Sequence, residues 1–121
     1  MHEMSVAVAL LERVLAEASL GGLVTVSQVT VEVGALQSIE PDLLMEAFRA
    51  AAEGSPAQGA RLDVTQAPAQ ALCLACGRPF EPDYRSYTCP HCGRADLKIV
   101  KGKELFLLSL CGDEAAGALP R

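Results

Sequence analysis

Apolar residues recur every three or four positions near the start of the chain, and charged residues fall between them. This spacing predicts an amphipathic helix from Met4 to Ser19, which Gly21 and Gly22 end. The apolar side of this predicted helix consists of Ala7, Leu10, Leu11, Val14, Leu15 and Ala18.

A β-branched segment with alternating apolar positions follows at residues 24–33, and it predicts a strand that ends at Gly34. The apolar phase slips by one position between Val26 and Val29. Either a β-bulge lies at this point, or the strand begins nearer Gln28.

A second helix is predicted to begin around Glu40, Pro41 and Asp42. Proline is tolerated in the first turn of a helix, and acidic residues are favoured at its positive end. Gly54 is expected to end this helix. Its predicted buried stripe consists of Leu44, Ala47, Phe48 and Ala51.

Two further segments are predicted to form strands, residues 61–66 and 104–110. The second is so apolar that we do not expect it at an exposed sheet edge unless one face is covered. Together these patterns predict an α+β fold, in which a small three-stranded sheet is combined with two helices.

The predicted elements divide the chain into two lobes. Residues 1–68 and 104–115 are expected to form a discontinuous α/β lobe, and residues 69–103 are expected to form a smaller, cysteine-rich lobe inserted into it. Residues 116–121 are rich in alanine and glycine, and the acidic stretch that leads into them begins at Gly112. We expect this tail to be mobile.

The composition narrows the function classes. The 121 residues carry ten basic and fifteen acidic side chains, for a formal net charge of −5, and only 4% of them are aromatic. This balance argues against nucleic-acid binding, which requires basic patches and stacking aromatics. No apolar run is long enough to span a bilayer, and no basic residue precedes the first apolar stretch as it would in a secretory signal. The expected location is therefore cytoplasmic, without membrane attachment.

Four of the five cysteines form two Cys-x-x-Cys pairs, Cys73 with Cys76 and Cys89 with Cys92, and twelve residues separate the pairs. Two short-range pairs brought together by a hairpin supply the four thiolates of a tetrahedral metal site. A redox dithiol would instead need one such pair in a βαβ setting. Each pair is followed by a glycine, which we expect to let backbone amides point at the sulfurs.

This site is predicted to hold a structural zinc, because four thiolates leave no open position for a substrate. A lobe of this size buries too little surface to fold alone, and a structural metal can supply the missing stability. His91, inside the second pair, is interpreted as an exposed loop histidine, with an alternative ligand role left open. Cys111 is interpreted as a small hydrophobic residue.

The chain opens on Met1-His2-Glu3, which can bind a second metal. The Met1 amine, the amide nitrogen and Nδ1 of His2, and the amide of Glu3 can form fused chelate rings around one cation, and the Glu3 carboxylate can add an oxygen. In-plane nitrogen donors suit Cu(II) or Ni(II) rather than zinc. The alternative is an unremarkable frayed terminus.

Three other functions are alternatives to transient metal binding at the N-terminus. A zinc-ribbon interaction or nucleic-acid-binding module without a nickel role is one, although the cysteine-rich region has no basic stripe. Rubredoxin-like electron transfer is another, because paired Cys-x-x-Cys turns also bind iron. A hydrolase is the third, but no nucleophile has a candidate base beside it, so we do not expect an enzyme.

Several motifs together resemble the HypA/HybF family of hydrogenase maturation factors. The resemblance covers nearly the whole chain except about its last ten residues. It rests on Met1-His2-Glu3-Met4-Ser5, Val33-Gly34-Ala35-Leu36, Pro41-Asp42-Leu43 with Ala47-Phe48, Gly59-Ala60-Arg61-Leu62, the two Cys-x-x-Cys-Gly turns and Gly102-Lys103-Glu104-Leu105.

The resemblance implies a nickel metallochaperone with a nickel-binding α/β lobe and an inserted zinc lobe. It implies transient Ni(II) binding at Met1, His2 and Glu3, with Glu40 as an additional candidate ligand, and structural Zn(II) at Cys73, Cys76, Cys89 and Cys92. It further implies delivery of nickel to the precursor of the [NiFe]-hydrogenase large subunit, together with a HypB-type nickel-handling GTPase. In some lineages such proteins also serve urease maturation.

Overall fold

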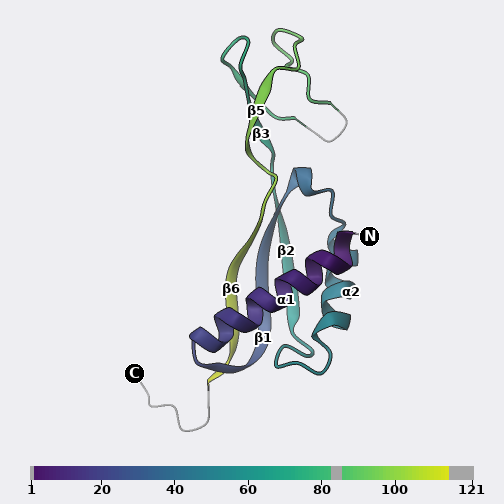
Figure 1. Cartoon of the computed structure of the whole chain (residues 1–121), viewed down its shortest axis with the longest axis vertical. Helices are drawn as coiled ribbons and strands as arrows, with labels where there is room; N and C mark the ends of the chain where they lie inside the picture. Colours follow the sequence, from purple (N-terminus) through teal and green to yellow (C-terminus); the bar gives the residue numbers. More distant parts are fainter. Residues whose placement is uncertain (1, 83–85, 115–121) are drawn as a thin grey trace. The chain divides into compact units, whose positions relative to one another are not determined.

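The computed structural model describes residues 2–82 and 86–114, with the side chain of His2 left out. It is an α+β protein with two helices and two three-stranded sheets, in the strand orders β2-β1-β6 and β4-β3-β5 (Figure 1). The elements are α1 (His2–Leu20), β1 (Leu23–Gly34), the 3-10 turn η1 (Ala35–Gln37), α2 (Pro41–Ala52), β2 (Arg61–Ala67), β3 (Gln70–Cys73), β4 (Pro79–Phe80), β5 (Leu97–Lys101) and β6 (Leu105–Glu114).

Two compact units can be distinguished by their internal contacts. Within the described residues, the first unit consists of 2–31, 39–64 and 107–114, and the second of 32–38, 65–82 and 86–106. The cysteine-rich segment predicted as an inserted lobe, residues 69–103, lies within the second unit. The tail predicted at 116–121 lies outside the described residues.

The predicted first helix is confirmed, and it begins earlier than its apolar pattern, at His2. Its buried positions are those of the predicted stripe, with Leu11 and Leu15 half-buried at the margin. The helix ends where predicted: the N–H of Gly21 donates to the carbonyl of Glu17, and Gly22 adopts a φ of 78°. Glycine is favoured at such a position because a Cβ would be strained there.

Strand β1 begins at Leu23, so the alternative of a start near Gln28 is wrong. The alternation of buried and exposed side chains is interrupted where the sequence pattern is interrupted, because Val26 is buried and the next buried residue is Val29, three positions later. From Val29 the inward positions alternate regularly to the end of the strand.

Helix α2 begins at Pro41 as predicted, and the Glu40 carboxylate caps it by accepting the backbone N–H of Asp42. Its buried residues are Leu44, Ala47, Phe48 and Ala52. Ala51, which was predicted in the buried stripe, is half-buried, and the fully buried residue at this end of the helix is Ala52, four residues beyond Phe48. Helices α1 and α2 pack against each other.

The core of the first unit combines both helices with the inward face of β1. Its largest fully buried side chains are Phe48, Leu44, Val14, Val29 and Val31. These side chains account for the apolar periodicities of three separate segments of the sequence, which shows that one face of each element points into a common core.

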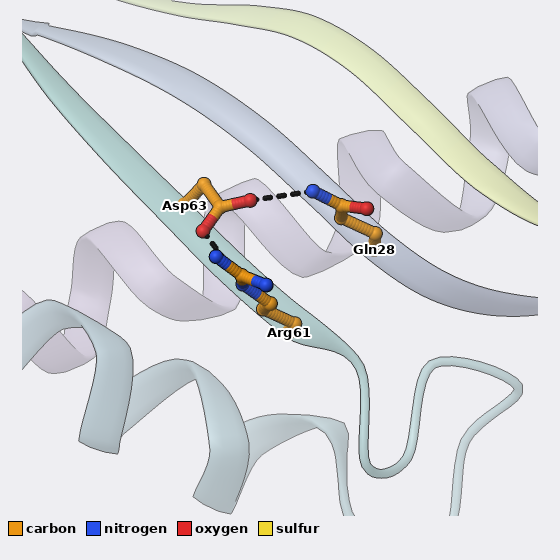
Figure 2. A network of polar contacts seen from close by, with 3 residues as sticks. All are labelled: Gln28, Arg61 and Asp63. Carbon is orange, nitrogen blue, oxygen red and sulfur yellow. Dashed lines mark hydrogen bonds and ion pairs between the residues drawn. The ribbon is translucent and has the colours of Figure 1, made fainter.

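A polar network lies on β1 and β2, on the face of these strands turned away from α1 (Figure 2). The side-chain amide of Gln28 donates to one oxygen of the Asp63 carboxylate, and Nε of Arg61 approaches the other at 2.8 Å. The Gln28 amide, and next the Arg61 guanidinium, lower the pKa of Asp63 below its ordinary value. The network joins two neighbouring strands on a face that the helices do not cover.

In the second unit, β3 pairs antiparallel with both β4 and β5, with Ala71 opposite Phe80 and Cys73 opposite Leu97. These short strands add to the three that the sequence patterns predicted. They surround a small core of Ala71, Cys73, Phe80 and Cys89, against which Leu97 and Ile99 pack. Two of the four buried members of this core are therefore cysteines.

Two glycines of the second unit allow a close backbone approach. The N–H of Gly34 donates to the carbonyl of Glu104, and the N–H of Leu36 donates to the carbonyl of Gly102. A Cβ built at Gly34 would overlap the backbone of Gly102. A side chain at this position would therefore separate the two segments.

Strand β6 is longer than predicted. It continues to Glu114, so the tail expected from Gly112 is strand in its first three residues. The reason is a close approach to β1, because a Cβ at Gly112 would overlap the Thr25 carbonyl, and the Thr25 hydroxyl donates to the Asp113 carboxylate at 3.0 Å. The strand also forms a sheet edge, with Leu108 54% exposed, but Leu107 and Leu110 are half-buried, so one face is partly covered, which is the condition under which the sequence allowed an edge.

None of the helices formed by the described residues is both long enough and apolar enough to cross a membrane.

Candidate metal centres

The two Cys-x-x-Cys segments fold into turns of the same construction, which we call the knuckles (residues 73–78 and 89–94). In the first, the N–H of Gly77 donates to the carbonyl of Cys73, and the N–H of Cys73 donates to the carbonyl of Arg78. The same two bonds recur in the second knuckle, between Gly93 and Cys89 and between Cys89 and Arg94. Gly77 and Gly93 both have a φ of 77°, which explains the glycine after each pair.

The knuckles bring four sulfur atoms together. The Sγ atoms of Cys73, Cys76, Cys89 and Cys92 all lie within 4.8 Å of one another. Cys73 and Cys92 are 3.6 Å apart, and Cys76 and Cys89 are 3.7 Å apart. A tetrahedral metal with bonds of about 2.3 Å to sulfur separates its ligands by about 3.8 Å. The separations therefore fit one tetrahedral metal ion, and they are too long for disulfides.

Backbone N–H groups point at the sulfurs and favour their thiolate form. The N–H of Cys76 donates to Sγ of Cys73, and the N–H of His91 donates to Sγ of Cys89, both at 3.4 Å. The N–H groups of Gly77 and Gly93 donate to carbonyl groups, and the turns that these glycines permit aim other backbone N–H groups at the sulfurs, as predicted. The N–H groups of the following residues, Arg78 and Arg94, reach Cys76 and Cys92.

The thiols differ in acidity. The N–H groups of Cys76 and then Ala75 lower the pKa of Cys73 to about 7. The N–H of Arg94 lowers the pKa of Cys92, but desolvation and the neighbouring sulfurs outweigh it and raise the value to about 11. Metal binding must displace these protons, so its affinity falls as the pH decreases.

The site is half enclosed, because Cys73 and Cys89 are buried whereas Cys76 and Cys92 are exposed. Four thiolates complete a tetrahedral coordination shell, so the arrangement can hold a structural metal but offers no position for a reacting water. Within the described residues, no other group of three or more Cys, His, Asp or Glu side chains comes as close together.

His91 lies on the second knuckle and is exposed. Its Nδ1 is 3.4 Å from a guanidinium nitrogen of Arg78, which belongs to the first knuckle. Arg78 and Arg94 were not among the site residues predicted from the sequence. Their signal is the repeated triplet Cys-Gly-Arg, which occurs at residues 76–78 and 92–94 and marks equivalent positions in the knuckles.

Of the predicted nickel ligands, Met1 and the side chain of His2 lie outside the described part of the structure. The backbone of His2 forms the first residue of α1, and Glu3 is half-buried in the first helical turn. Glu40 is close by, because its backbone N–H donates to the Glu3 carboxylate at 3.3 Å. The structure therefore brings Glu3 and Glu40 together at the start of both helices.

Both carboxylates have structural partners. The pKa of Glu3 is lowered by its own backbone N–H and then by the N–H of Glu40. The Glu40 carboxylate caps α2 through Asp42. The lowered pKa keeps the Glu3 carboxylate ionised near neutral pH. Cys111, by contrast, is exposed on β6 and is remote in sequence from both sites.

Known proteins resemble this chain over almost its whole length. Residues 1–111 match the family described as "Hydrogenase/urease nickel incorporation, metallochaperone, hypA". The hydrogenase maturation factor HypA of Chlorobium limicola is 38% identical over 114 residues, which cover 94% of this chain and 98% of the relative. The factor HybF of Klebsiella pneumoniae is 36% identical over 113 residues, which cover 93% of this chain and the whole of HybF.

Solved structures share the fold. The solution structure of the Ni metallochaperone HypA from Helicobacter pylori superimposes with a TM-score of 0.70, at 24% identity, and covers 93% of this chain and 98% of its own. A second solution structure of a HypA protein has a TM-score of 0.66 at 28% identity. The family consists of metallochaperones, which carry a metal and are not enzymes. On the match to its family and the agreement of the fold, the chain belongs to the HypA family of metallochaperones for nickel incorporation into hydrogenase and urease.

Proposed function

We propose that this protein binds Ni(II) at Met1, His2 and Glu3 and delivers it to the precursor of the [NiFe]-hydrogenase large subunit, while a structural Zn(II) holds the knuckles. The observation that carries the proposal is the family match, which begins at residue 1 and so includes Met1-His2-Glu3. Delivery in cooperation with a HypB-type GTPase is part of the proposal, as is service to urease maturation where that enzyme is present.

The start of α1 at His2 supports binding through backbone nitrogens. The first N–H groups of a helix have no acceptor within the helix, so the nitrogens of residues 2 and 3 can bind a metal without breaking a helical hydrogen bond. The Met1 amine and Nδ1 of His2 complete a nitrogen donor set suited to Ni(II).

The positive end of the α1 dipole opposes a cation at this position. The Glu3 carboxylate, which accepts the backbone N–H of Glu40, offsets that repulsion, and the Glu40 side chain, which caps α2, adds a second carboxylate. We therefore propose that Glu3 acts both as a nearby charge and as a candidate oxygen ligand, and that Glu40 acts mainly through its charge.

Ligand chemistry keeps the two metals apart. Nickel is carried and must be released to the acceptor, so it should be held by few ligands. A chain terminus provides a small set of nitrogen and oxygen ligands, which suit Ni(II). Zinc, as a structural ion, is enclosed by four sulfurs from the two knuckles. Iron bound by the four cysteines would give a coloured, redox-active protein, whereas zinc would not. Absorption spectra and metal analysis therefore distinguish iron from zinc at this site.

A nickel titration tests the terminal site. Untagged, zinc-loaded protein is compared with the same protein extended by one residue before Met1, which converts the terminal amine into an amide. We expect one nickel per chain at micromolar concentrations for the native terminus and at least tenfold weaker binding after extension. The variant His2→Ala should lose nickel binding in the same way, with zinc content and circular dichroism unchanged.

The control is Glu46→Gln, which removes an exposed carboxylate of α2 that is not part of the proposed site. It should bind nickel as the unmodified protein does. Equal binding by the extended protein or by His2→Ala would place the nickel site elsewhere and contradict the proposal.

A further inference from the structure

The four knuckle cysteines form two pairs across the knuckles, and each pair joins a buried residue to an exposed one. The Sγ atom of Cys73, which is buried, lies 3.6 Å from that of the exposed Cys92. The Sγ atom of Cys89, also buried, lies 3.7 Å from that of the exposed Cys76. Each knuckle therefore contributes one cysteine that is exposed to solvent and one that is enclosed beside the exposed cysteine of the other knuckle.

This arrangement suits a two-step oxidation by a dissolved peroxide. Hydrogen peroxide reaches an exposed cysteine more readily than a buried one. The exposed thiolate attacks one peroxide oxygen, the O–O bond breaks, and the products are a sulfenic acid and hydroxide. A second thiolate then attacks the sulfenic sulfur and expels hydroxide. In total, two thiolates and one hydrogen peroxide give one disulfide and two hydroxide ions.

The second thiolate is supplied by the buried cysteine of the other knuckle. A disulfide bond of about 2.05 Å requires each pair of sulfurs to close by about 1.6 Å. Rotation about χ1 of the exposed cysteine can supply this movement. The buried members can stay in place, because the N–H of Cys73 is bonded to the Arg78 carbonyl and the N–H of Cys89 to the Arg94 carbonyl.

We propose that the knuckles are a reversible oxidation site, at which peroxide converts the four thiols into two crossed disulfides, Cys73–Cys92 and Cys76–Cys89. The four sulfurs then no longer bind a metal ion, but the two bonds keep the knuckles joined. Cys111 belongs to the first unit and to neither pair. The inference rests on the proposed function only for the identity of the metal that oxidation releases.

The test uses zinc-loaded protein carrying Cys111→Ser, which removes the fifth thiol and with it disulfides between molecules. Metal analysis before oxidation counts the bound zinc, and one zinc per chain is the result that the proposed structural site requires. Hydrogen peroxide is then added in small excess. We expect loss of all four free thiols together with release of the zinc, which a colorimetric chelator detects.

Tryptic peptides distinguish crossed disulfides from disulfides within each knuckle. Trypsin does not cut before proline, so the chain stays intact after Arg78. The cysteines of the first knuckle then lie in peptide 62–85 and those of the second in peptide 86–94. Crossed disulfides link the two peptides, whereas disulfides within each Cys-x-x-Cys segment leave them separate. Fragmentation of the linked peptides identifies which sulfurs are joined.

Oxidation of the same protein in denaturant is the matched control. In an unfolded chain, cysteines three residues apart meet more often than cysteines 13 or 19 residues apart. We therefore expect the ratio of linked to separate peptides to be at least about fivefold higher after oxidation of the folded protein. Dithiothreitol and zinc should afterwards restore four thiols and one bound zinc, which irreversible oxidation to sulfinic acids would not allow.

Four results would overturn the proposal. They are separate peptides from the folded protein, a linked fraction no larger than that of the unfolded protein, linked peptides joined through other pairs of sulfurs, and thiols lost irreversibly. Crossed disulfides in protein that held no zinc before oxidation would support the oxidation site and contradict the structural zinc of the proposed function instead.

Discussion

At the scale of single residues, backbone N–H groups lower the pKa of two of the proposed metal ligands. The thiolate of Cys73 and the carboxylate of Glu3 both accept N–H groups from the start of a turn or helix, and their pKa values are lowered accordingly. The consequence for Cys73 is that its lowered pKa weakens the competition of protons with the metal for this sulfur.

Asp63 provides a residue-scale prediction that is independent of either metal. Its pKa is lowered in the folded protein by Gln28 and Arg61, so its ionised form adds stability above its unfolded pKa. This contribution is lost as the pH falls through the folded pKa. We expect Asp63→Asn to lower the melting temperature at pH 7 by about 2–4 °C, the effect of a partly screened surface interaction.

Melting curves between pH 7 and pH 2 check this. The difference between Asp63→Asn and the unmodified protein should shrink towards low pH, where both side chains are uncharged. Glu46→Gln, at an exposed position of α2, should show no such convergence. A difference for Asp63→Asn that stays constant down to pH 2 would contradict a role for the charge.

At the scale of elements, the C-terminal part of β6 depends on one glycine. A Cβ at Gly112 would overlap the carbonyl oxygen of Thr25 on β1. We expect Gly112→Ala to destabilise the protein by about 1–3 kcal/mol, because the strands must move apart to admit a methyl group. Chemical denaturation measures this change.

Gly21→Ala is the matched control at the end of α1. A Cβ there would meet the Glu17 carbonyl at 3.4 Å, and Gly21 does not require a positive φ. Its effect should remain within about 0.5 kcal/mol, as for an ordinary surface substitution. If Gly112→Ala is as mild as Gly21→Ala, β6 and β1 do not approach as closely as described.

The elements also show where periodicity is a reliable guide. Long helices were predictable, because one face of each is buried over several turns, as in α1 and α2. The short strands β3, β4 and β5 were not, since two to five residues give too few alternations to distinguish a strand from a loop. Cys73 and Cys89 are buried in the core that these strands surround. In the sequence, their Cys-x-x-Cys spacing indicates a metal site and gives no sign that the same side chains are core residues.

At the scale of the whole molecule, the two units depend on different sources of stability. The first unit buries large side chains such as Phe48, Leu44 and Val14. The core of the second unit is small, and two of its four buried members are the proposed ligands Cys73 and Cys89. A metal at the knuckles would therefore contribute to the folding of the second unit in particular.

Removal of the metal tests this dependence. With a strong chelator, we expect amide hydrogen exchange in β3 and β5 to accelerate at least 100-fold, as local unfolding of a structural-metal lobe requires, while α1 and α2 keep their protection. Added zinc should restore the protection. Unchanged exchange in β3 after complete removal of the metal would show that this core is stable without it.

The sequence by itself determined the type and order of the long elements, the four cysteines as a group and the membership of the HypA family, because periodicity, ligand spacing and local motifs are properties of neighbouring residues. Only the tertiary structure decided that β6 forms a sheet edge, that Gly34 and Gly112 permit close backbone approaches, and that Glu3 and Glu40 meet. Each of these depends on segments far apart in the chain, and which of them meet is settled by the packing of the whole core rather than by any local pattern.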